Sequence, residues 1–248
     1  MSWSPIVELR QYTLHPGKRD VLIDLFDREF IESQEALDMR VIGQFRDLDH
    51  ADRFVWVRGF RDMTNRAEGL QAFYGGPVWK QHRDDANATM IDSDNVLLLR
   101  PARSWSGFSP ARYQRPPRGS HGARSGLVVA SIYSLDNASE AAFIDYVEDE
   151  LRPALTDVGA AVLAYFVTES SANNFPALPI REGEHVFIWF AGFPDSTTYE
   201  GTIPGRGELG VSIPVAPRMQ LPTQVLRLLP TARSALTGSS RACPARTQ

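Results

Sequence analysis

An internal repeat is the feature that most restricts how this chain can fold. Three stretches of the first half return in the second half in the same order: IVELRQYTL at 6–14 and LVVASIYSL at 127–135, FVWVRGF at 54–60 and FIWFAGF at 187–193, NVLLLRP at 95–101 and QVLRLLP at 224–230. Two long copies indicate two domains of one fold and not a solenoid of short repeats. The chain has 248 residues, which fits two domains of about 100 residues each.

The two copies differ in their charged residues. The charged positions of the first copy have uncharged counterparts in the second, namely Val129 for Glu8, Ser131 for Arg10 and Ala191 for Arg58. Aromatic and glycine positions persist, as in the pairs Tyr12/Tyr133, Trp56/Trp189, Gly59/Gly192 and Phe60/Phe193. We interpret the second copy as a scaffold and the first copy as the same scaffold with a site.

The composition excludes several classes of protein. A net charge of −4 with 43% hydrophobic residues is typical of a globular protein and argues against a nucleic-acid partner. No apolar stretch approaches the ~20 residues of a membrane span, and residues 1–5 show no signal peptide. We therefore expect a cytoplasmic protein without a membrane partner. Cys243 is the only cysteine, which excludes an intramolecular disulfide and a cysteine-based zinc site.

Hydrophobic periodicity predicts the order β-α-β-β-α-β in each copy. Residues 6–14 alternate as a strand does, whereas residues 18–36 carry apolar side chains at helical spacing. The further elements expected in the first copy are strands at 40–46, 53–60 and 96–100 and helices at 62–73 and 78–90. The second copy is expected to have a first helix at 139–158 and a shortened second helix. This order is that of the ferredoxin-like unit, an antiparallel sheet with helices on one face.

The predicted domain boundaries follow from this order. The first domain covers residues 1–101 and the second covers 127–230. The linker between them, 102–126, is rich in Arg, Pro, Gly and Ser and contains no acidic residue. It is interpreted either as a crossover on the surface or as an arm that binds phosphate or another anion. Residues 231–248 are expected to form a disordered polar tail.

A sheet with helices on one face leaves its other face bare. Two bare faces in one chain can pack together, so we predict a closed or nearly closed barrel with the helices outside. The expected fold class is therefore α+β, with two tandem ferredoxin-like units packed sheet to sheet. The residues predicted to fill the interface between the sheets are Leu14, Val55, Val57, Val128 and Ile188.

The first half of the chain resembles the NIPSNAP family. The motifs that carry the resemblance are VELRQY at 7–12, PGK at 16–18, GQFRDLD at 43–49, DRFVWVRGF at 52–60, FYGGPVWKQHR at 73–83, NATM at 87–90 and DSDNVLLLR at 92–100. The resemblance is close over about 5–101 and looser over 127–230. It implies a dimeric α+β barrel, built here from tandem halves, with any site in the first half. This superfamily includes cofactor-free oxygenases, isomerases, cyclases and haem-binding enzymes, and fold analogy does not choose among them.

Polar and aromatic side chains are expected to converge on the first sheet. Glu8, Arg10 and Tyr12 share one face of the first strand, and Trp56 and Arg58 share one face of the third. These two strands are neighbours in a ferredoxin-like sheet. Glu8 beside two arginines would stay ionised with a lowered pKa and would clamp the arginines instead of acting as a base. A free guanidinium there would bind a carboxylate or phenolate. The alternative is a purely structural ion-pair network.

A second group of candidates follows the turn at 75–77. His82 could transfer a proton near neutral pH, ligate haem, or serve as a hydrogen-bonded structural residue. The side chains predicted to contact a substrate are Tyr12, Trp56, Tyr74, Trp79, Arg83 and Asn87. No spacing of His, Asp and Glu predicts a metal site.

Three functions remain open from the sequence. The first is an enzyme that oxygenates, isomerises or cyclises an aromatic or conjugated anion without a metal or another cofactor. His82 would transfer the proton, while Arg10 and Arg58 would hold the anion. The second is a non-catalytic module for ligand binding or assembly, and the third is a haem-binding variant with His82 as the axial ligand. A small-molecule partner and a homo-oligomer with exposed sheet edges are expected in either of the first two cases.

Overall fold

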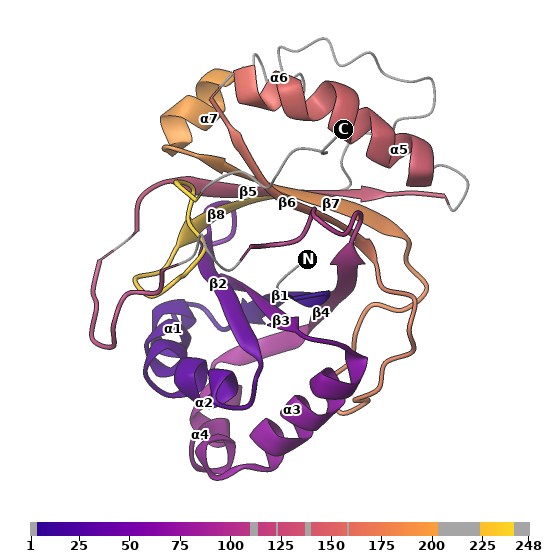
Figure 1. Cartoon of the computed structure of the whole chain (residues 1–248). Coiled ribbons are helices and arrows are strands. Elements are labelled where there is room, and N and C mark those ends of the chain that lie inside the picture. Colours follow the sequence, from indigo (N-terminus) through magenta and orange to yellow (C-terminus); the bar gives the residue numbers. More distant parts are fainter. Residues whose placement is uncertain are drawn as a thin grey trace.

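The computed structural model describes residues 4–109, 114–122, 124–136, 140–157, 159–202 and 224–240. In this part of the chain the strands close into one barrel, with helices on two opposite sides of it (Figure 1). The strands are β1 (Ile6–Leu14), β2 (Arg40–Asp47), β3 (Arg53–Phe60), β4 (Met90–Pro101), β5 (Leu127–Ser134), β6 (Ala161–Thr168), β7 (Val186–Phe193) and β8 (Gln224–Pro230). The helices are α1 (Arg19–Leu25), α2 (Ile31–Glu35), α3 (Met63–Gly75), α4 (Pro77–Asn87), α5 (Glu140–Tyr146), α6 (Arg152–Asp157) and α7 (Ser196–Thr202), with π-helical turns η1 (Phe26–Phe30) and η3 (Val147–Leu151).

The element boundaries have local causes. Asp62 caps α3 by accepting a hydrogen bond from the backbone N–H of Asn65 at 2.7 Å. Gly76 ends that helix, and Pro77 begins α4 at a position where its missing N–H costs nothing. The prediction for β4 was wrong at its start, because the strand begins at Met90 and not at 96. Its first part carries exposed polar residues, which the apolar pattern could not reveal.

The strand order of the barrel is the same in both halves. Around the barrel it is β1-β3-β2-β8-β5-β7-β6-β4, so the halves read β4-β1-β3-β2 and β8-β5-β7-β6. All pairs are antiparallel. The halves join at two seams, β2–β8 and β4–β6, each with three residue pairs in register. The predicted closed barrel is confirmed, and its closure removes the free sheet edges that were expected to favour oligomers.

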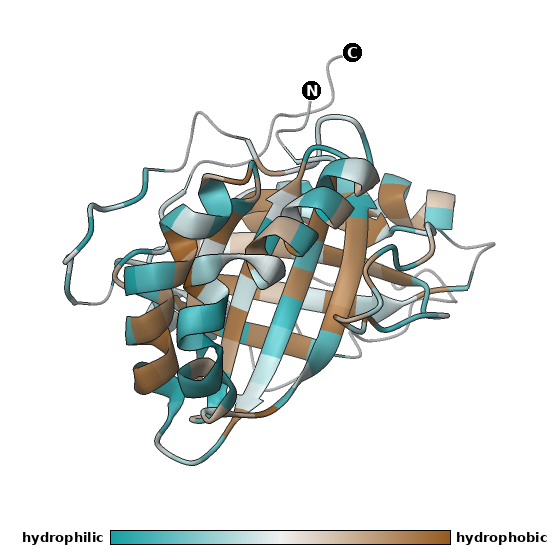
Figure 2. Ribbon diagram, turned by 90° about the horizontal axis from the view of Figure 1, so that it is seen from below, coloured by the Kyte–Doolittle hydropathy of each residue, from teal (hydrophilic) through white to brown (hydrophobic). Residues whose placement is uncertain are grey.

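Alternation along the strands separates an interior core from two outer layers. Val55, Val57, Val128 and Ile188 lie in the interior core, as predicted. Leu14 was assigned to the wrong layer, since it packs between the first-half strands and their helices. The second-half strands and helices enclose a third apolar cluster. Figure 2 shows brown, hydrophobic residues on both the strands and the helices, with teal, hydrophilic residues among them on each.

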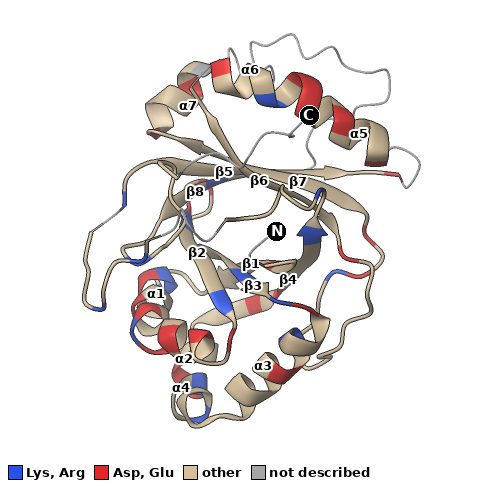
Figure 3. Cartoon of the chain, in the orientation of Figure 1, with Lys and Arg blue, Asp and Glu red and all other residues tan. Residues whose placement is uncertain are grey.

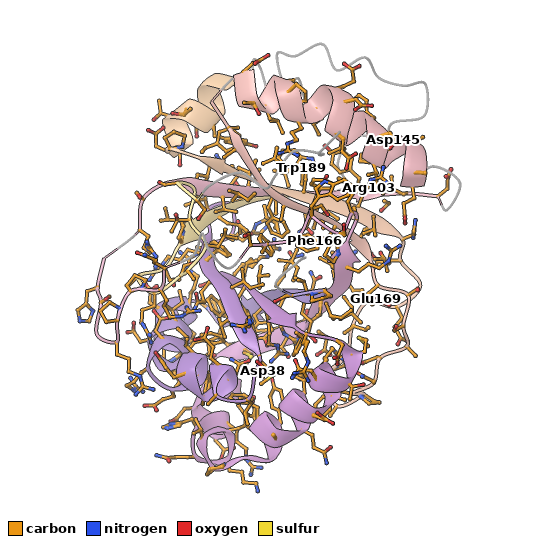
Figure 4. All side chains as sticks on the ribbon, in the orientation of Figure 1. Asp38, Arg103, Asp145, Phe166, Glu169 and Trp189 are labelled. Carbon is orange, nitrogen blue, oxygen red and sulfur yellow. The ribbon has the colours of Figure 1, made fainter. Side chains whose placement is uncertain are left out.

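The linker is not only a surface crossover. Phe108 is 1% exposed and packs in the barrel core on Phe166 and Phe190, with ring centroids 5.0 and 5.2 Å away. Linker arginines pair with acids on the outer helices. Arg103 lies 2.5 Å from Asp145 of α5 (Figure 4), while Arg115 contacts Glu35 and Arg118 contacts Glu32. These pairs give Arg103, Arg115 and Arg118 carboxylate partners within the chain, which favours a strap over an anion-binding arm.

The disordered tail expected from residue 231 onward does not hold for 231–240. The N–H groups of Thr231 and Leu236 donate to the carbonyls of Gln44 and Ile42, both at 2.9 Å, and Leu236 is buried in the interior core. β8 pairs with β2 only at Phe45–Asp47, so this segment supplies the partners that the rest of β2 lacks. Residues 241–248 lie outside the described residues.

Among the described residues, none of the helices combines the length and the apolar character that crossing a membrane requires.

Candidate functional site

The candidate site lies where the first-half sheet faces its helices. Glu8 is the register partner of Arg58 across β1 and β3, and Arg10 is the partner of Trp56. The predicted convergence of the two strands is therefore correct. Figure 3 shows charged residues on the first-half strands, whereas β5, β6 and β7 carry none. The buried charge cluster therefore lies in the first half.

Glu8 is held by three guanidiniums. Its Oε2 accepts from Arg58 Nη2 at 2.6 Å and from Arg10 Nη1 at 2.9 Å. Its Oε1 accepts from Arg66 Nε of α3 at 2.8 Å. All four side chains are 1% exposed or less. Two further contacts orient the arginines: Arg58 donates to Gln34 Oε1 at 2.8 Å, and Arg10 Nε donates to the Tyr12 hydroxyl at 3.1 Å.

The charges of this cluster do not balance. Three guanidiniums surround one carboxylate, and within the described residues no second carboxylate pairs with them. Arginine stays protonated in proteins, so two positive charges are in excess. A buried ion without a partner costs several kcal/mol. Arg66 Nη2 and Trp56 Nε1 are also buried donors without a hydrogen-bond partner in the protein. The cluster lacks acceptors and negative charge, which an anionic ligand would supply.

The electrostatics of the cluster make Glu8 a weak base. Burial by itself would raise its pKa, but the guanidiniums of Arg58, Arg10 and Arg66 hold the pKa of Glu8 well below its usual range. Burial lowers the pKa of Arg66, and Arg58 and Arg10 lower it further, against the opposite effect of Glu8. Glu8 therefore orients the arginines and does not accept a proton near neutral pH.

Aromatic rings form one wall of the site. The guanidiniums of Arg58 and Arg10 lie 4.9 and 5.6 Å from the Trp56 ring centroid, within cation–π range. Tyr12 meets Trp56 edge to face at 5.9 Å, and Phe26 of η1 lies 4.8 Å from Trp56. Trp56 and Tyr12 thus have the predicted position beside the arginines.

Tyr74 and Trp79 extend this wall toward α4. Their ring centroids are 4.8 Å apart, and Trp79 also packs on Phe30 and Phe73. Burial raises the pKa of Tyr74, and Tyr12 adds to the rise, while the nearby Arg58 and Arg10 oppose it. The phenol of Tyr74 therefore stays neutral near pH 7 and can donate a hydrogen bond.

The other candidates of α4 lie apart from the arginine cluster. His82 Nε2 is 3.9 Å from Glu29 Oε2, and its ring meets Phe30 at 6.4 Å. None of the contacts among the described residues joins His82 to Glu8 or its arginines. Arg83 is exposed and pairs with its neighbour Asp84, and Asn87 is exposed as well. The structure brings neither Arg83 nor Asn87 to the site.

Sequence reasoning missed one arginine of the cluster, although the repeat contained the signal. Continuing the alignment of Phe60 with Phe193 by six residues places Arg66 opposite Tyr199. The second half therefore lacks every charge of the cluster, including the one that α3 supplies. Local sequence patterns could not have predicted three further residues at the site. Asn173, Asn174 and Phe175 belong to the second half and contact Arg66 and Tyr74 of the first.

Within the described ranges, no group of three or more His, Cys, Asp and Glu side chains could hold a metal ion.

Comparisons with known proteins agree with this picture. Residues 7–106 match the NIPSNAP family model, which confirms the resemblance inferred for the first half. None of the curated proteins matches the chain. A NIPSNAP-like domain protein from Burkholderia xenovorans is 28% identical, with a TM-score of 0.38 over 42% of this chain and 90% of its own.

Two solved structures are similar to nearly the whole chain. A proposed monooxygenase from Lactobacillus acidophilus is 13% identical over 98% of this chain and 100% of its own, with a TM-score of 0.53. An anthrone oxidase-like protein is 11% identical over 98% of this chain and 96% of its own, with a TM-score of 0.52. At this identity the likeness shows the fold: both halves together form an α+β barrel in one chain.

Proposed function

We propose that the first half binds an aromatic or conjugated organic anion at the Glu8, Arg10, Arg58 and Arg66 cluster and acts on it without a metal. The observation that carries this proposal is the excess of two positive charges in a buried, aromatic-walled site. A carboxylate or phenolate would receive charge-assisted hydrogen bonds from the guanidinium edges. The conjugated part of the ligand would lie against Trp56, Tyr12 and the Tyr74–Trp79 pair.

The arginines favour reactions that pass through a delocalised anion. Preorganised cations stabilise negative charge that develops in a transition state, and they do so most strongly where water is excluded. A stabilised carbanion or phenolate can react directly with O₂, and it can also isomerise or cyclise. The full-length structural relatives include proteins described as a monooxygenase and as anthrone oxidase-like, which supports oxygenation as the reaction to test first.

Each residue has a distinct role in this proposal. Arg10, Arg58 and Arg66 hold the anion, and Glu8 fixes their directions. His82 is the proposed proton-transfer group, since it is the imidazole that packs beside the aromatic wall. For that role the ligand must extend from the arginines along Trp79 to His82.

Binding is tested with 1-hydroxy-2-naphthoate, an aromatic anion, and with its neutral amide as the matched control. A hydrogen bond to a charged group is worth about 1.5–3 kcal/mol, so the anion should bind roughly 10- to 100-fold more tightly than the amide. Fluorescence titration measures both affinities. Equal affinities would overturn an anion site.

Turnover is tested with anthrone in the presence of a chelator, where one O₂ should be consumed for each anthraquinone and water formed.

Non-catalytic binding is the second candidate function, and a specific observation favours it. Glu8 is held ionised by three arginines, and no base contacts the cluster among the described residues. The variant His82→Gln separates the two functions. Loss of turnover with unchanged affinity for 1-hydroxy-2-naphthoate supports the enzyme, whereas absent turnover in the wild-type protein with intact binding supports the binding module.

A haem-binding function fits the site less well. Phe30, Phe73 and Trp79 pack on one another beside His82, with centroids 5.7 to 5.9 Å apart. A haem ligated by His82 would have to displace these rings and separate the imidazole from Glu29. We therefore propose chemistry without haem. Native mass spectrometry with an absorbance spectrum checks this, and a Soret band in the purified protein would contradict it.

We also infer that the halves, 1–101 and 127–230, are tandem ferredoxin-like units. Their matching element and strand orders support this inference. Expression of residues 1–101 alone tests it, because an independent unit should pair with a second copy to close its barrel. A monomeric, unfolded fragment would argue against two units.

With the barrel already closed in one chain, the proposed homo-oligomer would form through the helices.

A further inference from the structure

We propose that residues 171–180 of the second half form a lid over the first-half site, with Arg66 as the latch that a ligand anion releases. This inference rests on the proposed function for the identity of the anion. In the closed state, side-chain amides of the lid occupy the guanidinium of Arg66. In the bound state, the ligand carboxylate or phenolate takes their place.

The lid belongs to a connection that only the second half possesses. The first half joins β2 to β3 through residues 48–52, whereas the second half joins β6 to β7 through residues 169–185. Connections longer than about 12–15 residues without secondary structure are uncommon and usually functional. The repeat therefore identifies residues 169–185 as an addition to the shared fold.

Both ends of this connection are anchored on β4. The backbone N–H of Glu169 donates to the Leu98 carbonyl, and that of Arg181 donates to the Val96 carbonyl, both at 2.9 Å. Figure 4 labels Glu169, where the chain leaves β6. Between these anchors the chain crosses from the second half to α3. A segment whose two ends are hydrogen-bonded to the barrel can open and close between them, as a lid does.

The span contacts the site through three adjacent residues. The Oδ1 atoms of Asn173 and Asn174 accept hydrogen bonds from Arg66 Nη1 at 3.1 and 2.6 Å. Asn174 also donates to the Met63 carbonyl at the start of α3, at 2.6 Å. Phe175 stacks on Tyr74 with centroids 5.9 Å apart and an angle of 26°. The closed lid thus covers a cation and an aromatic residue of the proposed site.

The latch contacts are replaceable by a stronger acceptor. Arg66 Nε is committed to Glu8, and Nη1 meets neutral amides, while the adjacent Nη2 has no partner. A carboxylate can accept from Nη1 and Nη2 together in the bidentate geometry that guanidinium favours. It would also neutralise one of the two excess charges. The amides can do neither, so ligand binding and latch release are coupled through one guanidinium.

The lid is held more weakly than the core it covers. Ser171, Ala172, Asn174, Pro176 and Ala177 are exposed, whereas Phe175, Leu178 and Ile180 are only partly buried against the first-half cluster. Few buried apolar contacts and exposed backbone are the features of a segment that opens locally.

The test compares three variants within the lid. Asn174→Ala removes the shorter of the two amide contacts to Arg66 and leaves that of Asn173, whereas Asn174→Asp gives Arg66 a permanent carboxylate. Ala177→Asp is the matched control, because it adds the same charge at an exposed lid position away from Arg66. All three changes are at exposed residues, so the variants should fold, and thermal unfolding confirms this.

Hydrogen exchange without any ligand is the first readout. The peptide that contains the N–H groups of Phe175, Leu178 and Arg181 should exchange faster in Asn174→Ala and more slowly in Asn174→Asp than in the wild type or Ala177→Asp. Identical exchange in all four proteins would overturn the latch, whatever binds to the site.

Stopped-flow fluorescence with 1-hydroxy-2-naphthoate is the second readout. Asn174→Ala should associate faster than the wild type, and Asn174→Asp should lose about tenfold in affinity while Ala177→Asp is unchanged. Equal losses in the two Asp variants would show a general charge effect and overturn the shared guanidinium. If the wild-type protein binds no aromatic anion, the proposed function fails. The exchange data then decide the lid separately.

Discussion

The two halves of the barrel place the same aromatic pair on the same strands and treat it differently. In the second half, Trp189 Nε1 lies 3.4 Å from the Tyr133 hydroxyl and can donate to it. In the first half, Arg10 donates to the Tyr12 hydroxyl, and Trp56 Nε1 is left buried without a partner. The second-half pair therefore satisfies its own indole donor, whereas the first-half layer contains two buried donors without an acceptor, Trp56 Nε1 and Arg66 Nη2.

The strand register shows that the differing residues occupy equivalent positions in the two halves. Glu8 pairs with Arg58 across β1 and β3, and their counterparts Val129 and Ala191 pair across β5 and β7. The second half shows that the fold packs well with apolar residues at these positions. The buried charges of the first half are therefore not required by the architecture. Buried ion clusters are often replaceable by apolar residues without loss of stability, so the charges at these positions support the proposed ligand site.

The largest expected effect comes from removing the single carboxylate. Glu8→Gln leaves three buried guanidiniums without a counter-charge, and we expect a loss of about 3–5 kcal/mol in the free energy of unfolding. Urea unfolding measures it. Val129→Ala, at the matching position of the second half, is the control and should cost much less. Equal losses in the free energy of unfolding at the two positions would contradict the difference inferred between the halves.

Converting the first site into the second separates stability from binding. The quadruple variant Glu8→Val, Arg10→Ser, Arg58→Ala and Arg66→Tyr installs the second-half residues together. It should stay within about 2 kcal/mol of the wild-type stability, because the whole ion cluster is replaced by largely apolar groups. Affinity for 1-hydroxy-2-naphthoate should fall at least about 100-fold. Retained affinity in a folded variant would place the ligand elsewhere.

The two tyrosines should differ in a smaller, measurable way. Tyr12→Phe removes an acceptor from a charged guanidinium and should cost about 1.5–3 kcal/mol. Tyr133→Phe removes a long, neutral hydrogen bond and should cost about 0.5–1 kcal/mol. Chemical denaturation of both variants tests the order, and the reverse order would contradict the charged network.

The smallest predicted effect concerns the two π-helical turns. At the second position of η3, Glu148 Oε1 accepts from Tyr165 at 2.6 Å and from Arg103 at 3.3 Å. Asp27 occupies the second position of η1, and each of the two acids has one buried carboxylate oxygen without a partner, Glu148 Oε2 and Asp27 Oδ1. Burial raises the pKa of Asp27 to about 6, with Arg233 and Arg115 opposing and Asp24 adding to the rise.

The raised pKa of Asp27 fixes the direction of its pH effect. The folded protein binds this proton more tightly than the unfolded chain, so the stability from the protonated form is lost as pH rises through about 6. Asp27→Asn should add about 1 kcal/mol at pH 7, allowing for solvent screening, and nothing near pH 4. Glu148→Gln should instead destabilise. Unfolding curves at pH 4 and pH 7 measure whether each variant gains or loses free energy of unfolding.

Much of the fold and part of the site could be predicted because both depend on local periodicity. The alternation in residues 6–14 and 53–60 defined which side chains share a face, and it correctly brought Glu8, Arg10 and Arg58 together. The assignment of Leu14 to the barrel interior departed from this alternation, which puts Leu14 on the same face as Glu8, Arg10 and Tyr12, and the structure has it there, against the helices. Arg83 and Asn87, the substrate contacts predicted in the segment after the turn at 75–77, are both exposed on α4, because a local motif does not say which side of a helix faces the sheet.

By itself, the sequence determined that this protein has two related halves, which strands each half contains, and that the charges lie in the first. Only the tertiary structure decided that Phe108 and Leu236 fill the barrel, that Arg66 completes the cluster, and that residues 171–180 cover it. The physical reason is that strand patterns arise from neighbouring residues. The partners of an unpaired strand edge or a buried guanidinium are selected only when the closed barrel brings distant segments within hydrogen-bonding distance.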